Sequence, residues 1–418
     1  MSDARRGYKR TEVGVIPEDW EVKPLRQISP AQSVGLVINP STYFDDKGTV
    51  PMLVGSNVAP NRISWESARR ITTQSNAALS ASRLAAGDLV TVRVGEPGIT
   101  AVVPECLHGC NCASMMIVRQ HRSFNSQWLC HVMNSASGLA QVEHVQYGTA
   151  QKQFNISDAV NFSYQFPPLQ EQEAIAQALS DADALIESLE QLLTKKRQVK
   201  QGAMQELLTG KRRLPGFKDK WSTQSLEQIS AFITKGSTPT TYGFGWTDSG
   251  VTFLRSECVS EHGLDLNEAM FISSGAHRLL RRSEVRAGDI LMTITGNVGR
   301  VIILDPGFPE ANINQHIARI RISAGHVDPR FVFHMLTPPG VRSYYNSITT
   351  GQAYPQISLA QVRSTEISIP PLTEQTAIAT VLSDMDADIA ALETKLAKAY
   401  QLKQGMMQEL LTGKTRLV

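Results

Sequence analysis

Residues 200–211 read KQGAMQELLTGK and residues 403–414 read KQGMMQELLTGK, so that eleven of twelve positions are identical. Such dense identity between distant segments indicates an internal repeat, which must be recognised before a fold is assigned. Upstream, Gly87-Asp88-Leu89 matches Gly288-Asp289-Ile290 at an offset of 201 residues, and the Pro-Pro-Leu motif before each copy recurs at an offset of 203. A period of about 200 residues is too long for a solenoid. Each copy is therefore expected to be a globular domain with an appendage.

The repeat divides the chain into two long and two short segments. The short segments, residues 170–211 and 373–418, carry net charges of −2 and −1 and are closely similar to each other. The long segments, residues 1–169 and 212–372, carry +2 and +3 and share only scattered glycines and apolar positions. One scaffold is thus kept twice, while one surface differs between the copies. This pattern predicts two equal frames that hold two unequal binding domains.

Each short segment has the apolar spacing of one long helix. The apolar residues recur in steps of four and three, which is the seam of a coiled coil. Glu171 and Glu374 fall in the first turn, where the helix dipole favours an anion, and Gly210 and Gly413 stand where a glycine cap ends a helix. We expect the two helices to pair in antiparallel fashion; the alternative is one wall of a simple bundle. The predicted seam residues are Ile175, Leu179, Ile186, Leu189, Leu193, Ile378, Leu382, Ile389, Leu392 and Leu396.

Both long segments are expected to contain strands and helices. Residues 84–103 and 288–304 each read as two β-strands around a pair of glycines, because Val, Ile and Thr are enriched between turn signals. Helical patches lie near residues 127–133 and 329–336. The predicted fold is therefore α+β, with two pseudo-repeated globular domains joined by two long helices that form an antiparallel coiled coil.

No catalytic motif recurs in both copies. Residues 296–299 (GNVG) are too short for a dinucleotide or phosphate loop, and we interpret them as a hairpin turn. Residues 39–42 (NPST) only faintly resemble an adenine-methyltransferase tetrapeptide and are interpreted as a turn. Three cysteines and His108 within residues 106–112 suggest zinc, but their spacing is unusual and the second copy lacks them, which favours free thiols. Neither a catalytic residue nor a metal site is predicted.

Composition limits the environment of the chain. The longest apolar runs, such as residues 301–304, are far shorter than the roughly 20 residues that span a bilayer. The polar start, MSDARRGYKR, lacks the apolar segment of a secretory signal. Five cysteines, an odd number, suit a reducing compartment better than a disulfide framework. We therefore expect a cytoplasmic protein with no membrane span.

Basic and amide side chains on predicted loops are the candidate binding residues. Lysine and arginine neutralise phosphates, while arginine, glutamine and asparagine can read base edges in the major groove. The loops at residues 148–153 and 351–356 are the strongest candidates, since they occupy one position in both copies; the alternative for any single residue is a solvated surface charge. The candidate DNA-binding residues are Arg62, Arg69, Arg93, Gln151, Lys152, Gln153, Lys235, Ser237, Thr238, Arg255, Arg281, Arg300, Gln352, Tyr354 and Gln356.

Together these features resemble the specificity subunit of a type I restriction-modification enzyme. The resemblance rests on Pro-Pro-Leu-x-Glu-Gln before each helix, Gln-Glu-Leu-Leu-Thr-Gly-Lys at its end and the Gly-Asp-Leu/Ile hairpins, and it covers essentially the whole chain. Residues 235–239 (KGSTP) resemble the glycine-rich opening loop of the family. Residues 33–36 (SVGL) depart from it, which leaves the placement of loops in the first copy open.

The resemblance implies a non-catalytic protein that binds double-stranded DNA. Target recognition domains at residues 1–169 and 212–372 would each read half of a split, asymmetric site, and spacer helices at 170–211 and 373–418 would fix the gap. Two modification subunits, which use S-adenosylmethionine, are expected to dock on the frame, joined by restriction subunits that use ATP and Mg. No cofactor is therefore expected on this chain. Near-circular symmetry is also expected, with residues 7–20 packed near the end of the second helix.

Two rival interpretations stay open at this point. One is an enzyme whose motifs differ from the common ones, and the other is a coiled-coil interaction scaffold that binds proteins without DNA.

Overall fold

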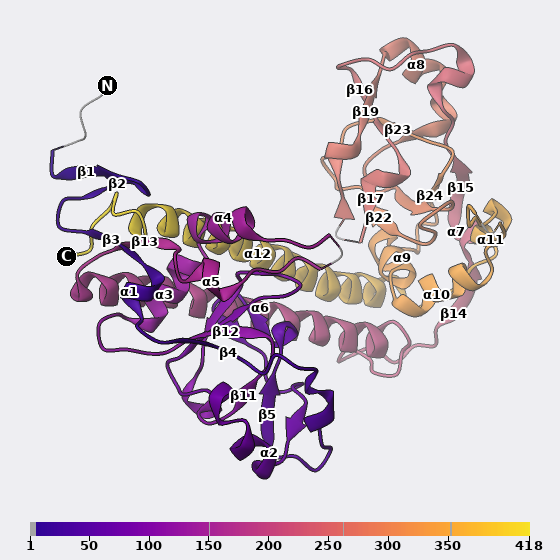
Figure 1. Cartoon of the computed structure of the whole chain (residues 1–418). Helices are drawn as coiled ribbons and strands as arrows, with labels where there is room; N and C mark the ends of the chain where they lie inside the picture. The colour runs from indigo at the N-terminus through magenta and orange to yellow at the C-terminus, as the bar shows by residue number, and fades with distance from the viewer. Residues whose placement is uncertain (1–5, 150, 262, 352) are drawn as a thin grey trace. The chain divides into compact units, whose positions relative to one another are not determined.

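The computed structural model describes residues 6–149, 151–261, 263–351 and 353–418 of the chain (Figure 1). The chain folds as two compact units. The first contains Met1–Glu190 together with Thr394–Val418, and the second contains Gln191–Glu393. Each long helix therefore contributes one part to each unit.

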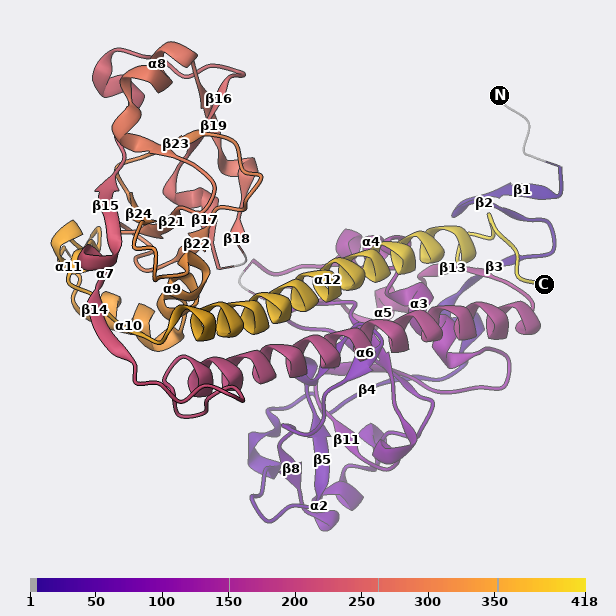
Figure 2. The ribbon, with the colours of Figure 1, turned by 180° about the vertical axis from the view of Figure 1, so that it is seen from behind.

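The two long helices are α6 (Leu169–Leu207) and α12 (Leu372–Leu410), each of 39 residues. In the first unit the start of α6 shares a core with the end of α12, since Ile175 packs in the same cluster as Leu410. In the second unit the end of α6 shares a core with the start of α12, since Leu207 packs with Ile378. The helices run antiparallel within each unit, as the sequence predicts (Figure 2).

The predicted seam residues are buried to different degrees. Those near the helix starts are the most buried, because they also contact the globular domains. Ile175, Leu179, Ile186, Leu189, Leu193, Ile378 and Leu382 are all buried, whereas Ile389, Leu392 and Leu396 are partly buried.

The globular part of the first unit is built on two small sheets. The first sheet has the order β10 (Thr100–Val102), β9 (Leu89–Val92), β12 (Met115–Val118), β4 (Gln32–Val34), and all its strands pair antiparallel. The second places β5 (Val50–Leu53) between β11 (Asn111–Cys112), which is parallel to it, and β8 (Arg70–Ile71). Around these sheets lie β6 (Val58–Ala59), β7 (Arg62–Ile63), α2 (Thr73–Ala78), α3 (Ser126–Met133), α4 (Ala136–Val145) and α5 (Ile156–Ala159).

The globular part of the second unit repeats this plan. Its first sheet has the order β15 (Ser230–Lys235), β24 (Ile317–Ile322), β21 (Ile290–Thr293), β22 (Val301–Ile303), and its second has β19 (Met270–Ile272), β16 (Val251–Leu254), β23 (Ala311–Ile313), β20 (Glu284–Val285). Strand β16 pairs parallel with β23, as β5 does with β11. Around these sheets lie β17 (Val259–Ser260), β18 (Gly263–Leu264), α7 (Leu226–Ile229), α8 (Ser274–Leu279), α9 (Pro329–Leu336), α10 (Pro339–Ser347) and α11 (Leu359–Arg363).

The sheet register locates the two extra residues of the second copy. Met115 pairs with Val92 in the first unit, and Ile317 pairs with Thr293 in the second. Since Val92 and Thr293 are 201 residues apart and Met115 and Ile317 are 202 apart, one residue is inserted directly before β24. The other insertion precedes α9, because the helix caps Asn125 and Asp328 are 203 residues apart. The insertion before β24 falls next to His316.

The opening loop of the first copy, which the sequence left open, occupies the same place as its counterpart. A Cβ atom on Gly35 would lie 2.8 Å from the carbonyl oxygen of Cys112, and one on Gly236 would lie 1.8 Å from that of Ile313. Both loops therefore pass directly over the parallel strand of the second sheet, where only glycine leaves enough room. The departure of residues 33–36 from the family pattern does not move this loop.

The ends of the chain meet as the sequence predicts. Strands β1 (Tyr8–Thr11) and β2 (Gly14–Pro17) form a hairpin, and the Tyr8 hydroxyl donates a 2.9 Å hydrogen bond to the carbonyl oxygen of Gly413. Trp20 is fully buried in the core that contains Leu410. Each helix leaves its domain through a two-stranded sheet: α6 follows β13 (Ser163–Phe166), which pairs with β3 (Glu21–Pro24), and α12 follows β25 (Glu366–Ile369), which pairs with β14 (Ser222–Ser225). A short helix, α1 (Leu25–Ile28), follows β3.

Among the described residues, no helix combines the length and the apolar character that crossing a membrane would require.

Candidate nucleic-acid interface

In the first domain, a hairpin tip and a loop are joined by backbone hydrogen bonds. The tip between β9 and β10 turns at Gly95 and Gly98, whose φ angles are +97° and +101°. The amide of Gly95 donates to the carbonyl of Lys152 at 3.0 Å, and Gln153 forms bridges with Val94 and Tyr147. The loop predicted at residues 148–153 is thereby fixed against the hairpin. We call this hairpin and loop the platform of the domain.

The second domain has the same platform. Gly296 and Gly299 turn the β21–β22 hairpin with φ angles of +77° and +81°, so residues 296–299 are a turn as predicted. The amide of Gly296 donates to the carbonyl of Pro355 at 2.8 Å, and Gln356 forms bridges with Thr295 and Thr350. One backbone arrangement is thus present twice, with different side chains.

The platforms carry several of the predicted DNA-binding residues. Gln151 and Lys152 are exposed, while Gln153 is partly buried. Tyr354 is 76% exposed, and Gln356 is also exposed. Gln352 lies outside the described residues. The structure therefore places these side chains, in both domains, where a ligand could reach them.

Two predicted arginines already have acidic partners. Arg62, on β7, lies 3.8 Å from a carboxylate oxygen of Glu190 in α6. Arg255 contacts Glu268 at 3.2 Å and also donates to the carbonyl of that residue. Binding a phosphate with either arginine would compete with these pairs. Glu190 is far from Arg62 in the sequence, so no local signal could reveal that pair.

The other predicted residues lie around the platforms. Arg93 donates to the carbonyl of Phe154 at 3.3 Å, and Arg300 donates to that of Val259 at 3.5 Å, which holds both near a hairpin. Thr238 donates to the side chain of Gln315, which in turn contacts His316 at 3.1 Å. Of the rest, Arg69 lies over the ring of Phe44, Lys235 is exposed at the end of β15, Arg281 is exposed, and Ser237 is partly buried.

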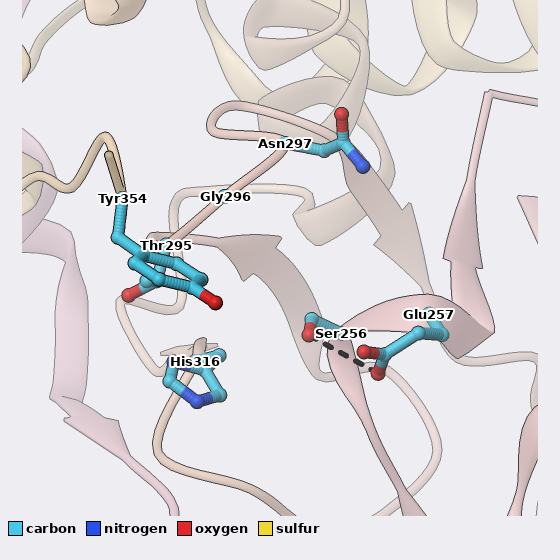
Figure 3. A pocket seen from close by; sticks show the side chains of 7 residues that line it. All are labelled: Ser256, Glu257, Thr295, Gly296, Asn297, His316 and Tyr354. Atoms are coloured by element: carbon cyan, nitrogen blue, oxygen red, sulfur yellow. Dashed lines mark hydrogen bonds between the residues drawn. The ribbon is translucent and has the colours of Figure 1, made fainter. Parts of the chain in front are cut away.

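A hollow of about 190 Å³ opens beside the platform of the second domain (Figure 3). Ser256, Glu257, Thr295, Asn297 and His316 line it together with Tyr354. Of these, only Tyr354 was predicted from the sequence. His316 could have been suspected from the insertion in the second copy, whereas Glu257 comes from a different loop and carries no local signal.

A buried histidine lies where each domain meets the helices. His131, on α3, has one ring nitrogen 3.9 Å from Asp183, whose carboxylate binds Lys403. Burial lowers the pKa of His131 to about 4, so it is neutral near pH 7 and the ion pair of Asp183 is with Lys403. In the second unit, burial likewise lowers the pKa of His334 to about 4. The contacts are therefore duplicated along with the fold.

Within the described residues, the cysteines of the first domain are not arranged as metal ligands. Cys106 is exposed, Cys110 and Cys112 are buried, and all are free thiols. Burial raises the pKa of the Cys110 thiol to about 12, which disfavours the thiolate that zinc requires. The described residues contain no cluster of three or more His, Cys, Asp or Glu side chains suited to a metal ion.

Comparison with known proteins identifies a matching family. Residues 17–198 and 219–400 each match the type I restriction modification DNA specificity domain. The chain is 25% identical over 429 residues to a putative type I restriction enzyme MjaX specificity subunit of Methanocaldococcus jannaschii, covering 98% of this chain and 97% of that protein.

Two solved structures share the fold. The S subunit of a type I restriction-modification system from M. genitalium aligns with a TM-score of 0.66 and 12% identity, over 94% of this chain and 96% of that one. A chain from a structure describing complex assembly and conformational transition of the type I R-M system aligns with a TM-score of 0.51 and 17% identity, over 96% and 99%.

Proposed function

The chain belongs to the type I restriction-modification DNA specificity family, and we propose that it selects DNA by reading two unequal half-sites, one with each recognition domain. The observation that carries this proposal is the platform. Its backbone hydrogen bonds are the same in both domains, whereas Gln151 and Lys152 of the first domain correspond to Tyr354 and Pro355 of the second. Equal frames with unequal side chains are what two different half-sites require.

The long helices are proposed to set the distance between the half-sites. Their antiparallel pairing is supported in each unit by an apolar core and by ion pairs. In the second unit Lys196 contacts Asp388 at 2.7 Å and Arg197 contacts Glu393 at 2.5 Å. In the first unit, Lys403 binds Asp183. A paired helix is stiffer than a single one, which suits a spacer.

The outer faces of the helices are proposed to bind two modification subunits, with restriction subunits joining the complex. Several apolar side chains on these faces are exposed: Leu185 and Leu402 in the first unit are 45% and 61% exposed, and Leu192 and Val199 in the second are 41% and 52% exposed. Apolar side chains in a row favour contact with another protein. S-adenosylmethionine, ATP and Mg would belong to these partners, in the cytoplasm, where the five thiols stay reduced.

A domain exchange tests the proposed function. Residues 21–166 would be replaced by the matching segment of a relative, so that the paired strands β3 and β13 are transferred together. The exchanged chain is then co-expressed with modification subunits, and N6-methyladenine is mapped across the genome. One half of the methylated sequence should change, while the other half and the gap stay the same.

The rival interpretations predict different results in this experiment. An unchanged methylated sequence would show that the first domain does not read DNA, as expected for a protein-binding scaffold. Methylation by the purified chain without modification subunits would instead establish an enzyme.

A further inference from the structure

The hollow of the second domain is formed by four separate segments. Ser256 and Glu257 come from a short turn before β17, Thr295 and Asn297 from the hairpin tip, His316 from the residue directly before β24 and Tyr354 from the platform loop. Figure 3 shows the ring of Tyr354 and the imidazole of His316 on one side and Ser256 and Glu257 on the other, with the Tyr354 hydroxyl directed into the space between them. Polar groups thus converge on a space open to solvent.

The backbone around the hollow is fixed before any ligand binds. The carbonyl of His316 accepts a 2.8 Å hydrogen bond from Ile294, and the amide of His316 donates to the side chain of Asn314 at 3.1 Å. The loop that carries Tyr354 is attached to the hairpin by the 2.8 Å bond between Gly296 and Pro355. Side chains on such a fixed backbone can discriminate between ligands, because little order has to be gained on binding.

Several polar groups of the side chains in the hollow have unused hydrogen-bonding capacity. Among the described residues, neither the amide of Asn297 nor the hydroxyl of Tyr354 has a hydrogen-bond partner. The carboxylate of Glu257 accepts a single bond, at 3.2 Å from the hydroxyl of Ser256. These groups are therefore available to a ligand.

The residues at these positions also differ between the two domains. At an offset of 201 residues, Ser56 stands in place of Glu257 and Glu96 in place of Asn297. The platform loops place Gln151 where the second domain has Tyr354, and the insertion next to His316 has no equivalent in the first domain. Variation of side chains on a retained backbone is expected where two domains must recognise different sequences.

The charge of the hollow favours a base over a phosphate as its ligand. No lysine or arginine is among the described residues that line it, and the carboxylate of Glu257 would repel a phosphate. In the major groove, a carboxylate can accept hydrogen bonds from the exocyclic amino groups of adenine and cytosine.

We propose that this hollow reads, in the second half-site, a base with an exocyclic amino group in the major groove, with Glu257 as the acceptor on one side of the base edge and Tyr354 and His316 facing it from the other. The proposal rests on the proposed function of the chain. It assigns Glu257 as a specificity-determining residue that recognises adenine or cytosine at one position.

The test measures discrimination at single positions of the half-site. The methylated sequence of the wild-type complex is mapped first, which also shows whether the position holds adenine or cytosine. The complex is then bound to duplexes in which each base pair of the second half-site is replaced in turn. In Glu257→Ala, the preference at one adenine or cytosine position should fall by on the order of tenfold, while discrimination at the other positions is retained.

Two further variants make the result decisive. His316→Ala should weaken discrimination at the same position, whereas Glu310→Ala, which removes an exposed carboxylate outside the hollow, should leave every position unchanged. If the wild-type complex methylates no split sequence, the proposed function itself fails. If it does, but neither Glu257→Ala nor His316→Ala alters any position, the proposal for the hollow is overturned.

Discussion

Arg416 lies 2.5 Å from the carboxylate of Glu171, and thereby joins the C-terminal tail to the first turn of α6. The repeat makes the same contact a second time: Arg213, which follows the end of α6, lies 2.5 Å from the carboxylate of Glu374 in the first turn of α12. Both glutamates are fully buried. In each unit, the arginine after the end of one helix therefore neutralises a buried charge at the start of the other.

Arg213→Ala is predicted to lower the free energy of unfolding, because removing one partner leaves a buried carboxylate uncompensated. Arg416→Ala should have a smaller effect, because Glu171 still accepts a 2.8 Å hydrogen bond from the indole of Trp20. Arg213 occupies both oxygens of Glu374, at 2.5 and 2.6 Å. Chemical denaturation of the purified variants measures the difference.

The neighbouring Arg212 provides a matched control. Its side chain is 75% exposed and contacts an exposed Glu206 at 3.4 Å. Arg212→Ala should therefore change stability by less than about 1 kcal/mol. Equal losses for Arg212→Ala and Arg213→Ala would refute the importance of the buried contact.

The protein is predicted to lose stability between about pH 6.5 and pH 4. Burial lowers the pKa of His131 and His334 to about 4 in the folded chain, whereas the ordinary pKa of an unfolded histidine is 6.5. The unfolded chain therefore binds more protons in this window, so stability falls as the pH falls. Each histidine accounts for a loss of up to about 3 kcal/mol in the free energy of unfolding across this pH window.

The groups facing each histidine limit this effect. Asp183 raises the pKa of His131 and Lys403 lowers it, and Asp386 and Lys200 act in the same two directions on His334. Unfolding curves of His131→Leu and His334→Leu from pH 7 to pH 4 give the measurement. If both variants lose stability over this range as steeply as the wild type, the histidines are not responsible.

The helices and platforms could be predicted because the sequence patterns that indicate them occur in both copies. A seam that recurs at a fixed offset identifies both partners of a coiled coil. The glycines of the hairpin tips mark turns because their positive φ angles are rarely accessible to other residues. Local chemistry and repetition together were sufficient for these elements.

The details of binding could not be predicted, because they depend on contacts between distant segments. Arg62 was predicted to bind DNA, but its ion pair with Glu190 of α6 could not be predicted. Glu257 and His316 share a hollow only because two sheets bring their loops together. Long-range pairing of this kind has no periodic signature in a sequence.

Lys152→Ala is predicted to weaken DNA binding by a similar factor for all sequences. Its side chain is exposed on the platform of the first domain, where it can neutralise a phosphate. The slope of log K against log salt should become shallower by about 1, since one fewer counterion is released. Titrations at several salt concentrations measure this slope. Lys218→Ala removes an exposed lysine outside the platform and should leave it unchanged; an unaltered slope in Lys152→Ala would exclude a phosphate contact.

The double variant Leu192→Asp and Val199→Asp is predicted to weaken binding of a modification subunit more than tenfold. Both side chains are exposed on α6, so charge there should not unfold the chain but would disfavour an apolar interface. Pull-down and calorimetric titration with the modification subunit give the affinity. Gln201→Asp adds a charge at an exposed polar position of the same helix and should bind normally. Normal binding by the double variant would place the docking surface elsewhere.

Lengthening both helices by one heptad is predicted to widen the gap between the half-sites. Seven residues add about 10.5 Å of helix, which corresponds to about three base pairs. The insertions belong after Glu190 in α6 and after Glu393 in α12, where each helix passes from one unit to the other, so that the antiparallel seam stays in register within both units. Methylation mapping should then give unchanged half-sites and a longer gap. A seven-residue insertion in the turn at residues 305–310 leaves the helices alone and should not alter the gap. If the gap keeps its length when the helices grow, helix length does not set the spacing.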